Sequence, residues 1–247
     1  MSDLNRSAAS GYAQQRAEAG YIDEGLRSFM LRVYNYMSVG LAVTGVAAYV
    51  TAMMAVDNGQ LTSFGQTLFF SPLKWVVMLA PLGFVFFLSA RIHKMSATGA
   101  QMAFWAFAGL MGLSLSSIFL VFTGESIVRV FFLAAATFGA MSLYGYTTKK
   151  DLSGWGSFLF MGLIGIIIAS VVNIFIGSSA IQFAVSVIGV LIFTGLTAYD
   201  TQQIKEMYYV GDDGTVTGQK AIMGALRLYL DFINLFMMML QLFGNRE

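Results

Sequence analysis

Long apolar runs, separated by short polar segments, fill the chain from residue 29 onward. A helix needs about 20 consecutive apolar residues to cross the hydrocarbon core of a bilayer. Seven runs reach this length, so the sequence predicts an all-α membrane protein with seven transmembrane helices. The expected spans are 29–55, 73–92, 100–123, 127–147, 155–177, 181–203 and 219–243. The connections between them are short, except for 56–72 and 204–218.

Residues 1–28 have a different pattern, because polar and charged side chains dominate there. No apolar core follows a short basic start, so we predict no cleavable signal peptide. The expected organisation is a polar cytoplasmic arm over 1–28, followed by one seven-helix domain over 29–247.

Composition agrees with this class. The 247 residues are 57% hydrophobic and 11% charged, with a mean hydropathy of +0.71, whereas soluble domains carry about 25% charged residues. The expected partner is therefore the lipid bilayer. A net charge of +1 gives no reason to predict nucleic acid binding. There is no cysteine, and a lone histidine, His93, cannot build a zinc site, so no resident cofactor is predicted.

The lysines and arginines predict the orientation, because cytoplasmic loops are enriched in both. With seven spans, ten of these residues fall on one side of the membrane, and three fall on the other. The ten are Arg6, Arg16, Arg27, Arg32, Arg91, Lys94, Lys149, Lys150, Lys205 and Lys220; the three are Lys74, Arg129 and Arg246. We expect a cytoplasmic amino terminus and a carboxyl terminus across the membrane. With six spans, the ten lysines and arginines would no longer all fall on one side.

Two carboxylates interrupt the last two spans. Asp200 follows the apolar run 181–198, and Asp231 lies inside the run 219–243. A charge at the centre of a membrane helix costs about 2.5–3.5 kcal/mol on insertion scales, so such a residue usually faces the bundle interior and has a function. Two acids in consecutive spans indicate a pair.

The pair could meet if the last span starts outside the membrane or is tilted. Asp231 is twelve residues after Gln219, which is about 18 Å of helix. Two carboxylates in contact cannot both ionise cheaply, so they are expected to share a proton and titrate as a unit. A calcium ion could replace the proton, which makes both acids possible calcium ligands. The alternative is two separate acids, each bonded to its own Tyr, Asn or Arg.

Two cations could modulate the acids. Arg227 lies four residues before Asp231, on the same helix face. Arg91 ends the second span at a depth similar to that of Asp200. The simpler interpretation of Arg91 is an anchor on the positively charged side of the membrane.

Three segments resemble the Bax inhibitor-1 family, also called the transmembrane Bax inhibitor motif family, in its bacterial form. They are residues 192–205 (IFTGLTAYDTQQIK), 228–236 (LYLDFINLF) and 144–153 (YGYTTKKDLS). The resemblance implies seven helices with the last enclosed by the other six, and a pH-sensitive calcium leak in a bacterial inner membrane. It also implies that Asp200 and Asp231 form a di-aspartyl pH sensor, with Arg91 able to latch onto Asp200.

Three functions stay open at this stage: a pH-gated calcium leak, an intramembrane aspartyl protease, and a non-conducting regulator of other membrane complexes. The protease needs Gly-x-Gly-Asp at its second acid, but Asp231 follows Leu-Tyr-Leu. It also needs a later Pro-Ala-Leu, and both prolines, Pro72 and Pro81, precede the acids. These differences disfavour the protease, so we do not expect an enzyme. The resemblance makes the calcium leak the expected function, and the non-conducting regulator remains the alternative.

Overall fold

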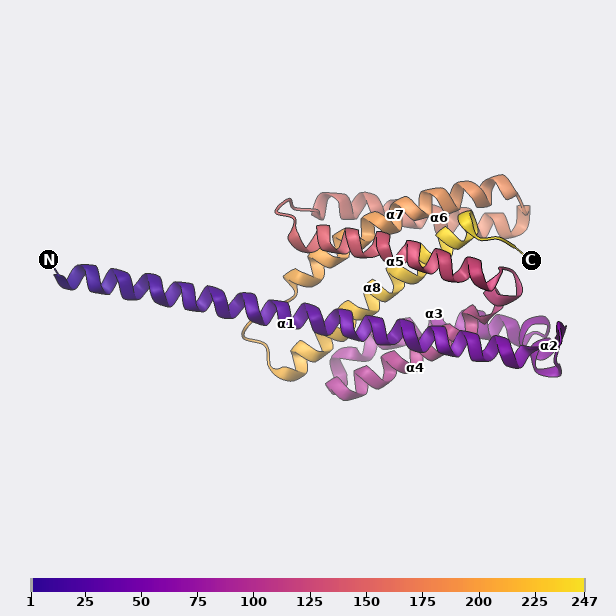
Figure 1. Ribbon diagram of the computed structural model, residues 1–247, viewed down its shortest axis with the longest axis horizontal. Helices are drawn as coiled ribbons and strands as arrows, with labels where there is room; N and C mark the ends of the chain where they lie inside the picture. Colours follow the sequence, from indigo (N-terminus) through magenta and orange to yellow (C-terminus); the bar gives the residue numbers. More distant parts are fainter. Residues whose placement is uncertain (1, 247) are drawn as a thin grey trace.

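The computed structural model describes the backbone of residues 2–246 and the side chains of residues 24–246 (Figure 1). These residues form α-helices, two short 3-10 helices and one two-stranded hairpin. In chain order the elements are α1 (Ser2–Ala55), β1 (Val56–Asp57), β2 (Gln60–Leu61), α2 (Ser63–Phe70), α3 (Leu73–Arg91), η1 (Ile92–Lys94), α4 (Ala97–Leu115), η2 (Ser116–Leu120), α5 (Gly124–Thr147), α6 (Ser153–Ile176), α7 (Ser179–Glu206) and α8 (Gly214–Phe243).

Seven helical segments are long and apolar enough to cross a membrane, and each coincides with a predicted span. The seven-span prediction is therefore confirmed. The predicted arm over 1–28 falls mainly on residues 1–23, whose side chains lie outside the described part of the structure, so it stays a prediction.

The long connection 56–72 is folded, which the apolar pattern did not predict. Asn58 and Gly59 have φ of 50° and 75° and form the turn of the β1–β2 hairpin. Such left-handed angles suit an Asn-Gly pair, and they match the twist of the flanking strands. The Thr62 hydroxyl then accepts a bond from the Gly65 N–H and caps α2.

The second long connection is shorter than predicted, since α7 continues to Glu206 and α8 already begins at Gly214. The Asp213 carboxylate accepts bonds from the N–H groups of Thr215 and Val216, both at 2.8 Å, and so caps α8. Asp212 forms an ion pair with Lys220 in the first turns of the same helix. The predicted start at residue 219 was too late because the capping acid precedes the apolar run.

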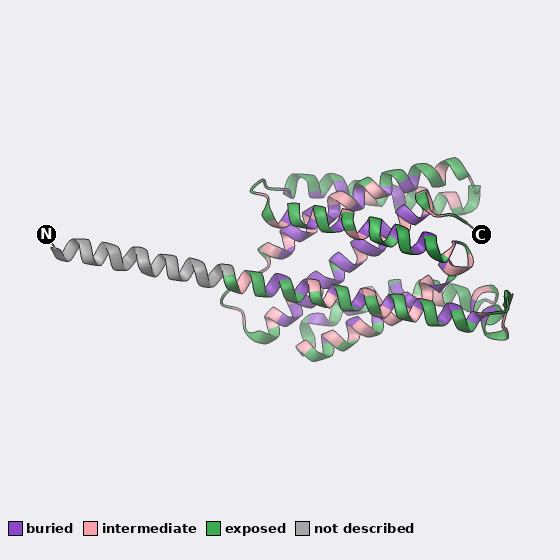
Figure 2. Ribbon diagram, viewed as in Figure 1, coloured by how far each residue is buried: buried purple, intermediate pink, exposed green. Residues whose placement is uncertain are grey.

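The last helix is the most buried span. Of its most apolar 18 residues, 67% are buried, against 11–39% in the other six spans, and Figure 2 shows α8 as the helix with the densest burial. Its direct neighbours are α1, α4, α5 and α7, while α3 packs on α4 and α6 packs on α7. The expectation that all six other spans enclose α8 goes beyond these contacts.

Glycines allow two of the close approaches in the bundle. A Cβ atom at Gly145 of α5 would lie 2.2 Å from the Ala198 carbonyl oxygen of α7, and one at Gly112 of α4 would lie 2.5 Å from the Thr44 carbonyl of α1. Without water to drive helices together, close backbone packing at small residues stabilises membrane bundles. The Gly145 contact brings α5 against α7 next to Asp200.

Candidate functional site: a carboxyl pair between α7 and α8

The two in-span acids lie on neighbouring helices. Asp200 is six residues before the end of α7, and Asp231 is 17 residues after the start of α8. The 17 residues from the start of α8 to Asp231 correspond to about 26 Å of helix. The two positions coincide because α8 begins five residues earlier than the predicted residue 219 and runs obliquely through the bundle (Figure 1).

The Asp200 and Asp231 carboxyl groups are close enough to interact with each other. Asp231 is only 5% exposed, whereas Asp200 is half-buried. Among the described residues, no donor bonds to the Asp231 Oδ2 atom. A buried acceptor without a donor costs free energy. A proton shared by the two acids would supply the missing O–H donor and remove the repulsion of two like charges.

Arg227 is the cation nearest to this pair in sequence, and its charge acts on both acids. Its side chain is exposed, although it belongs to the most buried helix. Within residues 24–246 the ion pair is that of Lys220 with Asp212, so Arg227 interacts with the acids without a direct bridge.

Arg91 lies elsewhere. It is exposed at the end of α3, a helix that packs on α4 and α2, and it makes no ion pair with Asp200 among the described residues. The structure thus brings together Asp200, Asp231 and Arg227 but not Arg91. A latch between Arg91 and Asp200 stays a prediction that requires a different arrangement of α3.

A chain of hydroxyl groups lies beside Asp200. The Tyr34 hydroxyl of α1 is 2.5 Å from Ser142 Oγ of α5, which is 3.0 Å from Thr201 Oγ1 of α7. Thr201 in turn donates to the Thr197 carbonyl at 2.7 Å. Three helices are therefore joined next to the residue that follows Asp200.

Gln202 and Lys205, at the end of segment 192–205, form hydrogen bonds with segment 144–153. The Gln202 amide accepts a bond from the Leu152 N–H and donates to the Lys150 carbonyl, both at 2.8 Å. Lys205 Nζ donates to the Tyr146 carbonyl at 3.0 Å. The segment 144–153 thus packs on segment 192–205 and fixes the end of α7 that carries Asp200.

The sequence did not point to Tyr34, Ser142 or the buried pair of Thr44 and Tyr229, whose hydroxyls are 2.6 Å apart. In-span hydroxyls were the available signal. That signal is weak, because many such groups bond only to their own helix, as Thr137 does with the Leu133 carbonyl. A single sequence does not show which in-span hydroxyls bond to another helix and which bond only to their own.

The acids do not form a resident metal site of the usual kind. No group of three or more His, Cys, Asp or Glu side chains lies together in the described part of the chain. Calcium prefers six to eight oxygen ligands, and two carboxylates supply only part of that set.

The sequence model of the family described as "Inhibitor of apoptosis-promoting Bax1" matches residues 26–247. The chain belongs to the Bax inhibitor-1 family. Family membership thus extends over all seven spans and both acids, and the protein is an integral membrane protein.

Bacterial relatives are similar to this chain along nearly their full length. The inner membrane protein YbhL of Escherichia coli is 49% identical over 225 residues, which are 90% of this chain and 94% of YbhL. An uncharacterized protein of Rickettsia prowazekii is 48% identical over 91% of this chain and 92% of its own length. An uncharacterized membrane protein of Streptococcus pyogenes is 35% identical over 91% and 96%.

Proposed function

We propose that this Bax inhibitor-1 family protein is a pH-sensitive calcium leak, gated by the Asp200–Asp231 pair. The observation that carries the proposal is the contact of two in-span carboxyl groups, one of which has a buried oxygen without a donor. Acids within a membrane are costly, and they commonly belong to ion or proton pathways. The proposed location is a bacterial inner membrane with the amino terminus in the cytoplasm, by analogy with YbhL and from the lysine and arginine asymmetry.

In the proposed mechanism, a shared proton holds α7 to α8. The protonated acid donates an O–H bond to its partner, and the seam between the two helices stays closed. When the proton leaves, two like charges face each other away from bulk water, and their repulsion favours separation of α7 and α8. Leak is therefore low at acidic pH and rises as the pH increases.

The expected response is graded. A tenfold difference in proton affinity between the closed and open arrangements supplies about 1.4 kcal/mol, which shifts populations without emptying either state. Arg227 limits the repulsion, because its charge acts on both carboxylates. In the open state the oxygens of Asp200 and Asp231 are available to a calcium ion, which is the transported species.

Calcium flux into liposomes that contain only this protein tests the proposal between about pH 6 and 8, a range above the ordinary carboxyl value of about 3.9. Replacing either acid by Asn removes the repulsion between ionised carboxylates, so Asp200→Asn and Asp231→Asn should flatten the pH dependence. Asp212→Asn is the matched control, since Asp212 pairs with Lys220 outside the seam, and its pH profile should stay unchanged.

Arg91→Ala extends the same experiment to the latch. If Arg91 reaches ionised Asp200 in another arrangement of α3, its removal should raise flux most at high pH. An unchanged pH profile in both Asn variants would refute the gate, whatever Arg91→Ala does. Folded protein that passes no calcium at any pH would refute the leak and favour a non-conducting regulator.

A further inference from the structure

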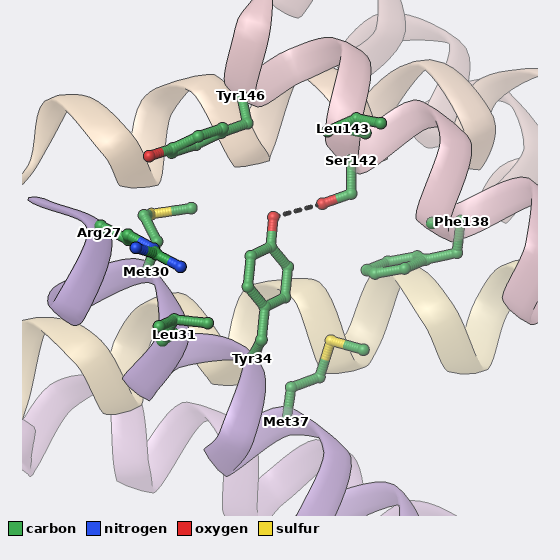
Figure 3. A pocket seen from close by; sticks show the side chains of 10 residues that line it. Arg27, Met30, Leu31, Tyr34, Met37, Phe138, Ser142, Leu143 and Tyr146 are labelled. Carbon is green, nitrogen blue, oxygen red and sulfur yellow. Dashed lines mark hydrogen bonds between the residues drawn. The ribbon is translucent and has the colours of Figure 1, made fainter.

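A groove opens between α1 and α5 in the half of the bundle that also holds the acids. Its volume is about 450 Å³, and Figure 3 shows the side chains that line it. The groove's floor is buried and its rim is exposed. The floor includes Met30, Met37 and Phe138, and the rim includes Leu31, Gly139 and Leu143.

The groove opens outward through the gap between α1 and α5. α1 packs on α4 and α8, and α5 packs on α7 and α8, but no extensive backbone contact joins α1 to α5 in the described residues. Both helices are membrane spans, so the exposed rim faces lipid. Lipid tails therefore have direct access to the groove.

The polar atoms at the floor are already bonded. The Tyr34 hydroxyl points at Ser142 across the groove (Figure 3), at 2.5 Å, and Ser142 also bonds to Thr201. A ligand in the groove therefore meets mostly hydrocarbon and thioether surface, which suits an acyl chain.

One end of the groove is cationic. Arg27, which precedes the apolar part of α1, lines that end and is exposed. Lys205 Nζ lies 5.6 Å from the ring centroid of Tyr146, another lining residue. No acidic side chain lines the groove, and Arg27 has no ion pair within residues 24–246. Positive charge at the end of a span is placed to meet the phosphate of a lipid headgroup.

We propose that this groove binds one anionic phospholipid, with an acyl chain between α1 and α5 and its phosphate at Arg27. The inference does not depend on the calcium leak. The acyl chain would cover the Tyr34–Ser142 bond, which continues through Thr201 to the residue next to Asp200. The bound lipid would thereby stabilise the contact of α1 with α5 and α7.

Two variants separate the headgroup from the acyl chain. Arg27→Gln removes the charge at the end of the groove. Arg32→Gln is its matched control, because Arg32 is exposed on the same helix but does not line the groove. Gly139→Leu fills the groove, since a Cβ atom at Gly139 meets nothing within 4 Å. Gly165→Leu in α6 is its control, because Gly165 is equally open and lies outside the groove.

The measurement is native mass spectrometry of the purified full chain in detergent, with equal amounts of phosphatidylglycerol and phosphatidylcholine. A cation near a membrane surface contributes about 1 kcal/mol to anionic lipid binding, so Arg27→Gln should weaken phosphatidylglycerol retention about fivefold. Phosphatidylcholine retention should fall less, because its choline offsets the charge of the phosphate. Gly139→Leu should lower the retention of both lipids, and the two controls should match the native chain.

Equal phosphatidylglycerol retention by the native chain and Arg27→Gln would overturn the proposal. The Arg27→Gln result tests the proposal even if Gly139→Leu fails to fold. A loss as large in Arg32→Gln as in Arg27→Gln would also overturn it, because the attraction would then be general. In a second mixture, of oleate with phosphatidylglycerol in equal amounts, preferential retention of oleate would exclude a phospholipid as the occupant.

Discussion

Helices α6 and α8 reverse the relation between hydrophobicity and burial that soluble proteins show. α6 is the most apolar of the seven spans, yet only 11% of its most apolar 18 residues are buried, against 67% in the less apolar α8. Lipid tails solvate apolar side chains as well as a protein core does, so nothing drives α6 inward. A polar side chain has no such solvent in the bilayer and is placed inside the bundle.

The side chains of the two helices follow this division. Phe175 and Ile174 of α6 are 85% and 72% exposed. α8 instead buries Tyr229, Asp231 and Gln219, and it packs at its glycines, such as Gly224 against Ile204. The comparison therefore predicts that the same kind of substitution has effects of different size in α6 and in α8.

The largest effect is expected from an acid on the lipid-facing helix. Ile164, near the middle of α6, is 45% exposed, so Ile164→Asp places a carboxylate in lipid without a partner. We expect insertion of α6 to become less favourable by about 2.5–3.5 kcal/mol. Protease protection of α6 in membranes measures this, with Ile164→Leu as the control. Normal insertion of Ile164→Asp would mean that α6 does not face lipid.

Truncation of apolar side chains should give the next largest difference. Leu235 of α8 is fully buried, and Leu235→Ala leaves a cavity that costs about 2 kcal/mol, the lower end of the range for core leucines. Phe175→Ala removes a side chain that lipid surrounds, so its cost should be much smaller. Unfolding of both variants in mixed micelles compares them. Equal losses of stability would contradict the assignment of α6 to lipid and α8 to the core.

The smallest effect concerns a buried hydrogen bond of α8. Tyr229→Phe removes the bond between the Tyr229 hydroxyl and Thr44 of α1. Hydrogen bonds between membrane helices contribute about 0.6 kcal/mol on average and reach about 1.7, so we expect a loss in that range in the same unfolding assay. Tyr144→Phe is the control, since Tyr144 is an exposed residue of α5. A larger loss in the control than in Tyr229→Phe would remove the special role of α8.

The seven spans, the class of protein and its family could all be predicted from the sequence. Each depends on local features: the length of apolar runs, the scarcity of charge, and segments such as 192–205 that keep their residue order. It also singled out Asp200 and Asp231, because an acid inside an apolar run is visible without any structure. The start of α8 was missed by five residues, since the capping Asp213 lies in a polar loop.

Which of these residues meet depends on how the helices pack. Asp200 and Asp231 face each other because of the early start and the oblique path of α8, and neither follows from hydropathy. Tyr34 and Ser142 are 108 residues apart, yet their hydroxyls bond across α1 and α5, while Arg91 stays away from the acids. Lipid solvates any apolar helix face equally well, so the apolar pattern determines which segments enter the membrane. How these segments pack depends on the fit between small and polar side chains.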